Sequence, residues 1–193
     1  MTYDEATQEH WINGLAPFDR DNERQIMAVF ALLGIPKTYI DFGSGTGAMV
    51  NLARKLGVEA YGVDLLERPD PYLFAHNLNE FFSLSTHSGP AQCELVSTVE
   101  TAEHIADEYH DTFCDMLVAH VASKGHLFFT AALPNQPGDG HIGCHPPEYW
   151  RLKLQDRGLQ YRADHSAHLA IIFGNMNSQL YWMAANVQVF RKP

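Results

Sequence analysis

A glycine-rich turn between an apolar segment and a helix start is the feature that most constrains the fold of this sequence. Residues 39–50 read YIDFGSGTGAMV, with an acid at Asp41 and glycines at positions 43, 45 and 47. Glycine takes positive φ angles and lets a ligand approach the backbone, and a helix start offers free N–H groups. A tight turn that binds nothing is the alternative, but so many glycines would weaken it. The turn therefore indicates a ligand site at the end of a strand.

Strands and helices are predicted to alternate along the chain. Residues 38–42 and 58–64 read as strands on either side of a helix at 48–57, which makes a compact βαβ unit. Further strands are predicted at residues 72–78, 93–99, 126–132, 159–163 and 180–192. This alternation predicts a doubly wound α/β fold, in which ligands bind at the carboxyl ends of the strands.

The N-terminal 36 residues precede this core and are predicted to contain one helix. Residues 1–19 are expected to be irregular, because Gly14 and the proline that follows are breakers. The helix is predicted to start at Asp21 as its N-cap and to end at Gly34. Later helices are predicted at residues 100–121 and 147–158.

The composition favours one domain over residues 1–193 and excludes several classes of protein. The formal charge is −10, from 23 acidic and 13 basic residues, so a nucleic-acid partner is not expected. The apolar runs are too short for a membrane span, and the acidic N-terminus does not resemble a signal peptide. Three cysteines without CxxC spacing fit a reducing, cytoplasmic setting. Nothing in the composition indicates an oligomeric state.

Two acids narrow the chemistry of the ligand. Asp64 closes the second predicted strand, where a carboxylate can accept hydrogen bonds from the ribose hydroxyls of an adenosine. Both NAD and S-adenosylmethionine fit such a site, and Gly43, Gly45 and Ala48 satisfy the dinucleotide G-x-G-x-x-G/A form. Asp41, two residues before the first glycine, suits an ammonium and a sulfonium better than a pyrophosphate. The pattern therefore favours S-adenosylmethionine.

Three motifs make residues 37–160 resemble the class I S-adenosylmethionine-dependent methyltransferases. They are DFGSGTG, the acid after AYGV, and ELVSTVETAEHI, and HLFFTAALP is similar to the fifth strand and its loop. The resemblance implies a mostly parallel seven-stranded sheet with helices on both faces. It also implies an enzyme that uses S-adenosylmethionine as its methyl donor.

The resemblance also assigns residues to parts of the cofactor. Asn77 stands where relatives have an acid, and its amide still offers a donor and an acceptor to a base edge. The implied contacts are Asp41, Gly43, Ser44, Gly45 and Gly47 for the methionine part, Asp64 for the ribose, and Leu65, Asn77 and Leu78 for the adenine, with Glu100 near the transferred methyl group.

The sequence ETAEH suggests a metal site. Glu100, Glu103 and His104 have spacings of three and four residues, which place side chains on one face of a helix. Two carboxylates and an imidazole can hold a divalent ion with one more ligand, for which His145 or His141 is available. The arrangement resembles the E-x-x-E-H…H pattern of small-RNA terminal 2′-O-methyltransferases. The alternative is that these side chains shape a substrate pocket.

The loop at residues 133–147 is dense in proline, glycine and histidine, and long loops in compact domains are usually functional. His141 and His145 are candidate general bases, because neutral imidazole removes protons near pH 7. Glu100, just after the fourth predicted strand, is a third candidate for a role near the reacting atoms. A loop histidine bonded to backbone is the alternative for either imidazole.

The expected activity is methyl transfer to oxygen or nitrogen of a small or sugar-like acceptor. The acceptor pocket is expected to combine the N-terminal segment, the loop at 133–147 and residues 164–178, which read as a lid or as a packed helix. Two alternatives stay open. One is a metal-assisted RNA-end 2′-O-methyltransferase, and the other is a catalytically silent S-adenosylmethionine-binding module.

Overall fold

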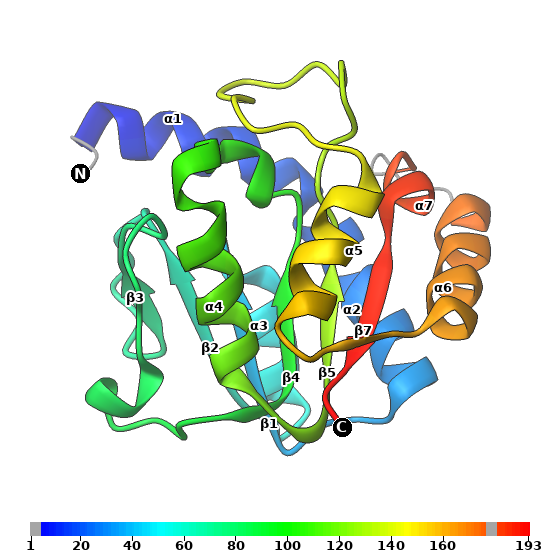
Figure 1. Cartoon of the computed structure of the whole chain (residues 1–193). Helices are drawn as coiled ribbons and strands as arrows, with labels where there is room; N and C mark the ends of the chain where they lie inside the picture. The colour runs from blue at the N-terminus through cyan, green and yellow to red at the C-terminus, as the bar shows by residue number, and fades with distance from the viewer. Residues whose placement is uncertain (1–4, 177–180) are drawn as a thin grey trace.

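A seven-stranded sheet forms the centre of the computed structural model, which describes residues 5–176 and 181–193 (Figure 1). The strand order is β3-β2-β1-β4-β5-β7-β6, in which β7 runs antiparallel to both neighbours and the other pairs are parallel. The strands are β1 Thr38–Phe42, β2 Glu59–Asp64, β3 Leu73–Ala75, β4 Cys93–Thr98, β5 Val121–Phe129, β6 Gln160–Tyr161 and β7 Gln188–Arg191. The predicted α/β fold is confirmed.

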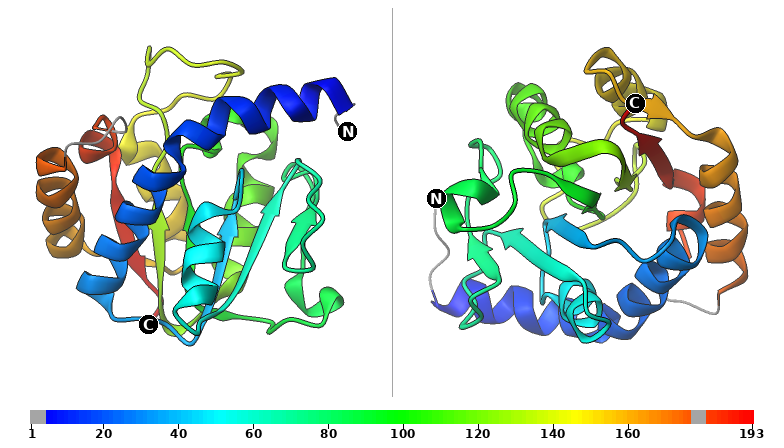
Figure 2. Two further views of the ribbon diagram at one scale, coloured as in Figure 1. Left: turned by 180° about the vertical axis from the view of Figure 1, so that it is seen from behind. Right: turned by 90° about the horizontal axis from the view of Figure 1, so that it is seen from below.

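Helices cover both faces of this sheet, as predicted. Figure 2 shows α2 and α3 on one face, whereas α4 and α5 lie on the other face in Figure 1. Each face has its own apolar core, with Val29 and Tyr39 in one and Phe42 and Phe113 in the other. The helices are α1 Glu5–Leu15, α2 Asp19–Leu33, α3 Ala48–Lys55, α4 His110–His120, α5 Pro147–Asp156, α6 Ala163–Asn175 and α7 Met183–Asn186.

The switch point of the sheet lies between β1 and β4. The chain winds from β1 through β2 and β3 on one side, then returns to place β4 on the other side of β1. Loops leaving the carboxyl ends of β1 and β4 therefore diverge and leave a crevice for a ligand. In Figure 1, α1 and the loop after β5 cross the molecule above this edge.

The N-terminal segment differs from the prediction, because residues 5–15 form a helix that contains Gly14. The following Pro17 lies at the start of a short 3₁₀ turn, where its missing N–H is not needed. Trp11 and Leu15 are half-buried, so packing over the strand ends offsets the weak helix propensity of glycine. Helix α2 begins at Asp19, and the predicted N-cap Asp21 lies inside its first turn.

The segment expected to be helical from residue 100 is mostly irregular until α4 begins. Glu100 has a positive φ of 49°, and Ala102–His104 and Asp107–Tyr109 are short 3₁₀ turns. Glu100, Glu103 and His104 therefore do not share a helix face, contrary to the expectation from their spacing.

The C-terminal prediction is correct for β7 but wrong for the residues just before it. Residues 183–186 form α7 rather than strand. Of the two readings of residues 164–178, the packed helix is the one observed, because Leu169 and Phe173 of α6 are buried. The end of that segment, residues 177 and 178, lies outside the described residues. Within the described part of the chain, no helix has both the length and the apolar character needed to cross a bilayer.

Candidate active site

The glycine turn between β1 and α3 has a backbone conformation that favours glycine. Gly43, Gly45 and Gly47 all have positive φ angles, of 81°, 52° and 81°. A Cβ atom on Gly43 would lie 2.0 Å from the hydroxyl oxygen of Thr101. The amides of Gly43 and Ser44 donate to the carbonyl of Val63 in β2. The turn is thus held against the sheet in a conformation that other residues do not fit.

Asp64 joins the end of β2 to this turn. One carboxylate oxygen accepts a hydrogen bond from the Gly45 amide at 2.8 Å, and the other accepts from Leu66 at 3.0 Å. A carboxylate has about four lone-pair sites, so these bonds leave capacity for two hydroxyl groups. Burial raises the pKa of Asp64. The side chain can hold the turn and a ribose at the same time.

Asp41 lies beneath the turn, at the end of β1, with 1 % of its surface exposed. Its Oδ1 accepts a hydrogen bond from Ser97, which also bonds to the hydroxyl of Tyr39 at 2.8 Å. Its Oδ2 has no hydrogen-bond partner in the described part of the chain. Burial raises the pKa of Asp41 to about 7. A buried carboxylate with one unpartnered oxygen fits a ligand that carries positive charge.

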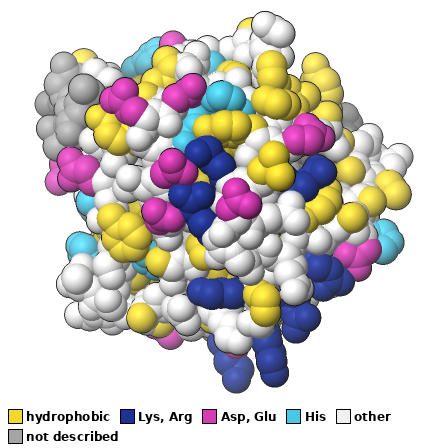
Figure 3. Space-filling view, viewed as in Figure 1, with side chains coloured by type: hydrophobic (Ala, Val, Ile, Leu, Met, Phe, Trp, Pro, Cys, Tyr) yellow, Lys and Arg dark blue, Asp and Glu magenta, His cyan; other side chains and the backbone are white. Residues whose placement is uncertain are grey.

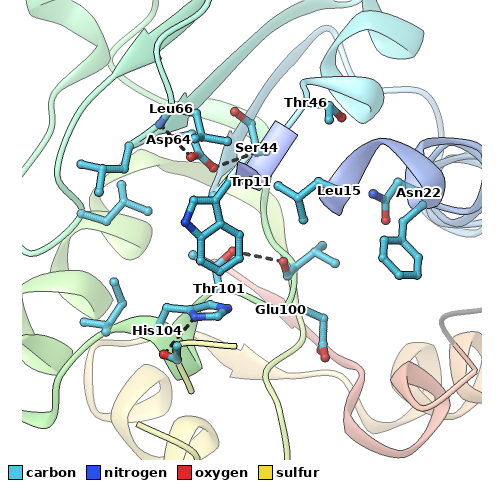
Figure 4. A pocket seen from close by; sticks show the side chains of 18 of the residues that line it. Trp11, Leu15, Asn22, Ser44, Thr46, Asp64, Leu66, Glu100, Thr101 and His104 are labelled. Carbon is cyan, nitrogen blue, oxygen red and sulfur yellow. Dashed lines mark hydrogen bonds between the residues drawn. The ribbon is translucent and has the colours of Figure 1, made fainter. Parts of the chain in front are cut away.

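A cavity of about 500 Å³ opens above these acids, within the range of about 300–1,000 Å³ typical of small-molecule sites. One side, which we call the glycine wall, is formed by Gly43, Ser44, Gly45, Thr46, Asp64, Leu65, Leu66, Asn77 and Leu78 (Figure 4). The structure therefore brings together most of the residues expected to contact the cofactor. Asp41 and Gly47 are not among the lining residues.

A second group of lining residues, which we call the tryptophan wall, combines segments far apart in the sequence and meets the glycine wall where Leu15 lies beside Gly45. Its residues are Trp11, Leu15, Phe18, Asn22, His104, Ile105, Gly140 and Ile142. The rings of Trp11 and His104 meet edge to face, with centroids 6.1 Å apart (Figure 4). Beside them, His10 and Asp139 approach within 3.6 Å and connect α1 to the loop after β5. The sequence predicted contributions from the N-terminal segment and the loop at 133–147, but it did not single out Trp11, and none of the described residues at 164–176 lines the cavity.

His104 is the histidine among the lining residues of the cavity. Its Nδ1 lies 3.1 Å from the carbonyl oxygen of Gly140. Because a carbonyl only accepts, Nδ1 carries the proton, which leaves Nε2 as the acceptor in the neutral ring. Burial lowers the pKa of His104, so the neutral ring is favoured. From the sequence, His104 is predicted only as a metal ligand or as a residue that shapes the pocket.

His141 and His145, the expected bases, lie behind the cavity surface and are not among its lining residues. His145 stacks on Tyr149 with centroids 3.9 Å apart, and its Nε2 lies 2.9 Å from Asp107. His141 contacts the carbonyl of Gln136 at 3.1 Å through Nδ1. His145 thus fastens the loop after β5 to the rest of the fold, whereas this hydrogen bond of His141 lies within the loop.

Glu100 lines the cavity between the two walls, but its carboxylate is engaged elsewhere. It accepts hydrogen bonds from Trp182 at 2.8 Å, Asn186 at 3.0 Å and Gln136 at 3.2 Å. These donors belong to the segment with α7 and to the loop after β5. Glu100 therefore joins both segments to the end of β4.

The four residues expected to hold a metal, Glu100, Glu103, His104 and His145, do not form one group. Glu103, His104 and His141 offer ligand atoms within 4.8 Å of one another, whereas His145 groups with Asp107 and His110. Glu103 is fully buried, and neither carboxylate oxygen has a hydrogen-bond partner within the described residues. Burial, with the nearby Glu100 carboxylate, raises the pKa of Glu103 to about 8. The first of these groups has donors that fit a divalent ion.

Solved structures that are similar to this chain include methyltransferases. N-methyltransferase NodS from Bradyrhizobium japonicum WM9, in complex with S-adenosylhomocysteine, has a TM-score of 0.64 and 17% identity, with 97% of both chains covered. A 1,6-didemethyltoxoflavin-N1-methyltransferase from Burkholderia thailandensis has a TM-score of 0.62 and 16% identity, covering 95% of this chain and 84% of that one. Magnesium protoporphyrin IX methyltransferase from Synechocystis PCC 6803 has a TM-score of 0.64 and 14% identity, with coverages of 91% and 83%.

Sequence comparison identifies the family more directly. No curated protein sequence gives a significant match. A family model described as a methyltransferase domain matches residues 13–183, which include all the lining residues of the cavity except Trp11. The glycine turn, the two acids and this match agree with one another. The chain belongs to the methyltransferase-domain family and is an S-adenosylmethionine-dependent methyltransferase.

Proposed function

We propose that this enzyme methylates oxygen or nitrogen of a small-molecule acceptor. The observation that carries the proposal is the cavity itself, in which the glycine wall adjoins a second, mainly apolar group of lining residues. The first wall suits the cofactor, and the second is then available to the acceptor. The solved structures with this fold support a small acceptor, because their names include a toxoflavin precursor and magnesium protoporphyrin IX.

The glycine wall is proposed to bind and orient the cofactor. Asp64 accepts hydrogen bonds from the ribose, and Asp41 faces the positive charge of the methionine part from below. The backbone of Gly43, Ser44 and Gly45 surrounds that part, Gly47 shapes the turn behind it, and Leu65, Asn77 and Leu78 contact the adenine. S-adenosylmethionine supplies a methyl group on a cationic sulfur, and S-adenosylhomocysteine is left when the acceptor has taken that group.

The tryptophan wall is proposed to align the acceptor, which is the main requirement for methyl transfer. Nε2 of His104 is placed to accept the N–H or O–H hydrogen of the attacking atom. His141 and His145 support this arrangement from behind by fixing the loop. Glu100 fixes the loop and α7 relative to β4.

The surface chemistry does not favour an RNA end as the acceptor. In the centre of the face shown in Figure 3, basic side chains lie beside acidic ones. Lys153 and Arg157 both pair with Asp111, at 2.9 and 2.7 Å, and Arg157 also pairs with Asp115. Paired cations contribute little to binding a phosphate backbone, because the neighbouring acids repel it.

Methyl-transfer assays with a matched pair of variants test this function. Radiolabelled S-adenosylmethionine is offered with panels of amines and alcohols, and S-adenosylhomocysteine binding is measured by calorimetry. His104→Gln is expected to lower kcat at least about tenfold, which is less than the roughly 10²–10⁴-fold typical of a general base, without changing calorimetric affinity. His168→Gln, on the exposed face of α6, is the control. Cofactor binding without transfer to any acceptor favours the catalytically silent module.

A divalent ion held by Glu103, His104 and His141 is the alternative to the base role of His104, because Nε2 cannot both bind an ion and accept the hydrogen of the acceptor. The buried carboxylate without hydrogen-bond partners supports it. Bound Zn²⁺, Mn²⁺ or Mg²⁺ at a hundredfold excess over Kd stabilises the folded state by about 2.7 kcal/mol. A melting shift in the wild type that is lost in Glu103→Gln is the expected result. The absence of a shift with all three ions removes the ion from the proposal.

A further inference from the structure

Among the described residues, the cavity lining contains acidic but no basic Lys or Arg side chains. The acids are Asp64 and Glu100. A phosphate or carboxylate that enters must give up its hydration without meeting a cationic side chain. Glu100, the acid of the lining nearest to the tryptophan wall, offers it no attraction either. The cavity therefore disfavours anionic groups on whatever occupies the tryptophan wall.

The tryptophan wall offers mainly apolar surface. Its apolar members are Trp11, Leu15, Phe18, Ile105 and Ile142. Aromatic rings stack favourably against an indole at offset or edge-to-face geometries. Ile142 keeps 66% of its surface exposed, although it is apolar and lines the cavity. Together with the other apolar members of the wall, Ile142 gives a flat apolar ligand a surface to lie on.

The wall contains a directed hydrogen-bond acceptor beside the indole. His104 has its Nδ1 occupied by Gly140, so Nε2 is the ring atom that can meet a donor from the ligand. Trp11 contacts the same ring from α1. A ligand that stacks near Trp11 can therefore direct one N–H or O–H group at His104.

We infer that the acceptor is a flat, apolar molecule that brings no phosphate or carboxylate into the cavity and directs an N–H or O–H group at His104. This inference deepens the proposed function and rests on it. It selects neutral and cationic aromatic amines, alcohols and phenols over phosphorylated sugars, carboxylic acids and nucleotide ends.

Fragment binding to the protein saturated with S-adenosylhomocysteine tests the inference without a known substrate. One- and two-ring aromatic fragments are matched as alcohol, amine and carboxylate, for example tryptophol, tryptamine and indole-3-acetate. Ligand-observed NMR is expected to give alcohols and amines that bind at least about tenfold more tightly than the matched carboxylates. Equal binding of the carboxylates, or no binding by any fragment, overturns the inference.

A charge-introducing variant makes the test sharper. Ile142→Lys places a cation at the cavity, where the exposed side chain tolerates the change. It is expected to tighten binding of the carboxylates roughly three- to tenfold and to weaken that of the amines. Ile171→Lys, on α6 with 62% of the side chain exposed, is the matched control and should change neither. If both lysine variants act alike, the effect is not local to the cavity and the inference is wrong.

Calorimetry distinguishes a failure of the proposed function from a failure of the inference about the acceptor. If S-adenosylhomocysteine does not bind, the proposed function itself fails. If it binds but the fragments show no preference for charge, only the inference about the acceptor fails. Trp11→Ala should abolish the fragment signals while keeping cofactor affinity, and Tyr181→Ala, an exposed aromatic residue outside the lining, should keep both.

Discussion

The two walls of the cavity are built in different ways. The glycine wall rises directly from the ends of β1 and β2, and its turn is fixed by backbone hydrogen bonds and by Asp64. The tryptophan wall is assembled from α1, a 3₁₀ turn and the loop after β5, with side-chain contacts between them. The first wall is rigid because the sheet determines it. The second depends on how three distant segments pack.

The different construction of the two walls suggests that each binds a different ligand. A wall built from strand ends holds one ligand in one geometry, which suits a cofactor common to a family. A wall built from peripheral segments can change its lining without disturbing the sheet, which suits an acceptor that varies. Substitutions in the two walls should therefore differ in which property they change and by how much.

The largest expected effect is on stability, at the turn of the glycine wall. Gly43→Ala adds a Cβ that overlaps Thr101 and imposes a positive φ on alanine. Gly34→Ala also has a positive φ, but its Cβ meets nothing within 4 Å. Overpacking costs about 1–3 kcal/mol, so Gly43→Ala should lose that much more unfolding free energy than the control. Equal losses in denaturant titrations would mean that the close contact with Thr101 is not rigid.

Cofactor affinity should respond next most strongly, through Asp64. Asp64→Ala removes the charge-assisted hydrogen bonds to the ribose, worth about 1.5–3 kcal/mol, so S-adenosylhomocysteine should bind at least about tenfold more weakly. Calorimetry measures the change. Asp70→Ala is the control, because Asp70 also accepts a backbone bond, from Tyr72, but does not line the cavity. Unchanged affinity in Asp64→Ala contradicts the assignment of the glycine wall to the cofactor.

The pH dependence of the glycine wall should come from Asp41. Its pKa in the folded protein is about 7, above the unfolded value of 3.8. Between these two pKa values, Asp41 holds its proton more often in the folded protein than in the unfolded chain. The protonated carboxyl therefore stabilises the folded state at low pH, and this contribution is lost as pH rises from about 4 to about 7. The ammonium group of the ligand is attracted by the ionised carboxylate of Asp41. S-adenosylhomocysteine should therefore bind roughly tenfold more tightly at pH 8 than at pH 6. An unaltered pH dependence in Asp41→Asn would assign it to another group.

The smallest effect on stability is expected in the tryptophan wall. Ile142→Ala changes an exposed side chain, so the unfolding free energy should shift by no more than about 0.5 kcal/mol. Cofactor affinity should stay the same, while KM for the acceptor rises. A large loss of stability or of cofactor binding would show that the two walls are not independent.

Much of the sheet could be predicted from local pattern. The strand at residues 38–42 and the helix after the glycines are where periodicity placed them, because apolar runs bounded by glycine leave few alternatives. The helix at residues 5–15 and the irregular segment around Glu100 were mispredicted. In both places tertiary contacts decide, since Trp11 packs over the strand ends and the Glu100 carboxylate is held by donors more than 30 residues away.

The sequence by itself determined the cofactor side of this protein. Glycines with positive φ angles and acids at strand ends meet local requirements of the backbone and the ligand. The residues involved are close together in the sequence, so short motifs reveal them. Only the tertiary structure decided that His104 rather than His141 or His145 faces the cavity, and that Trp11 lies beside it. Those contacts join residues about 90 and more positions apart, and their geometry depends on packing that no local spacing specifies.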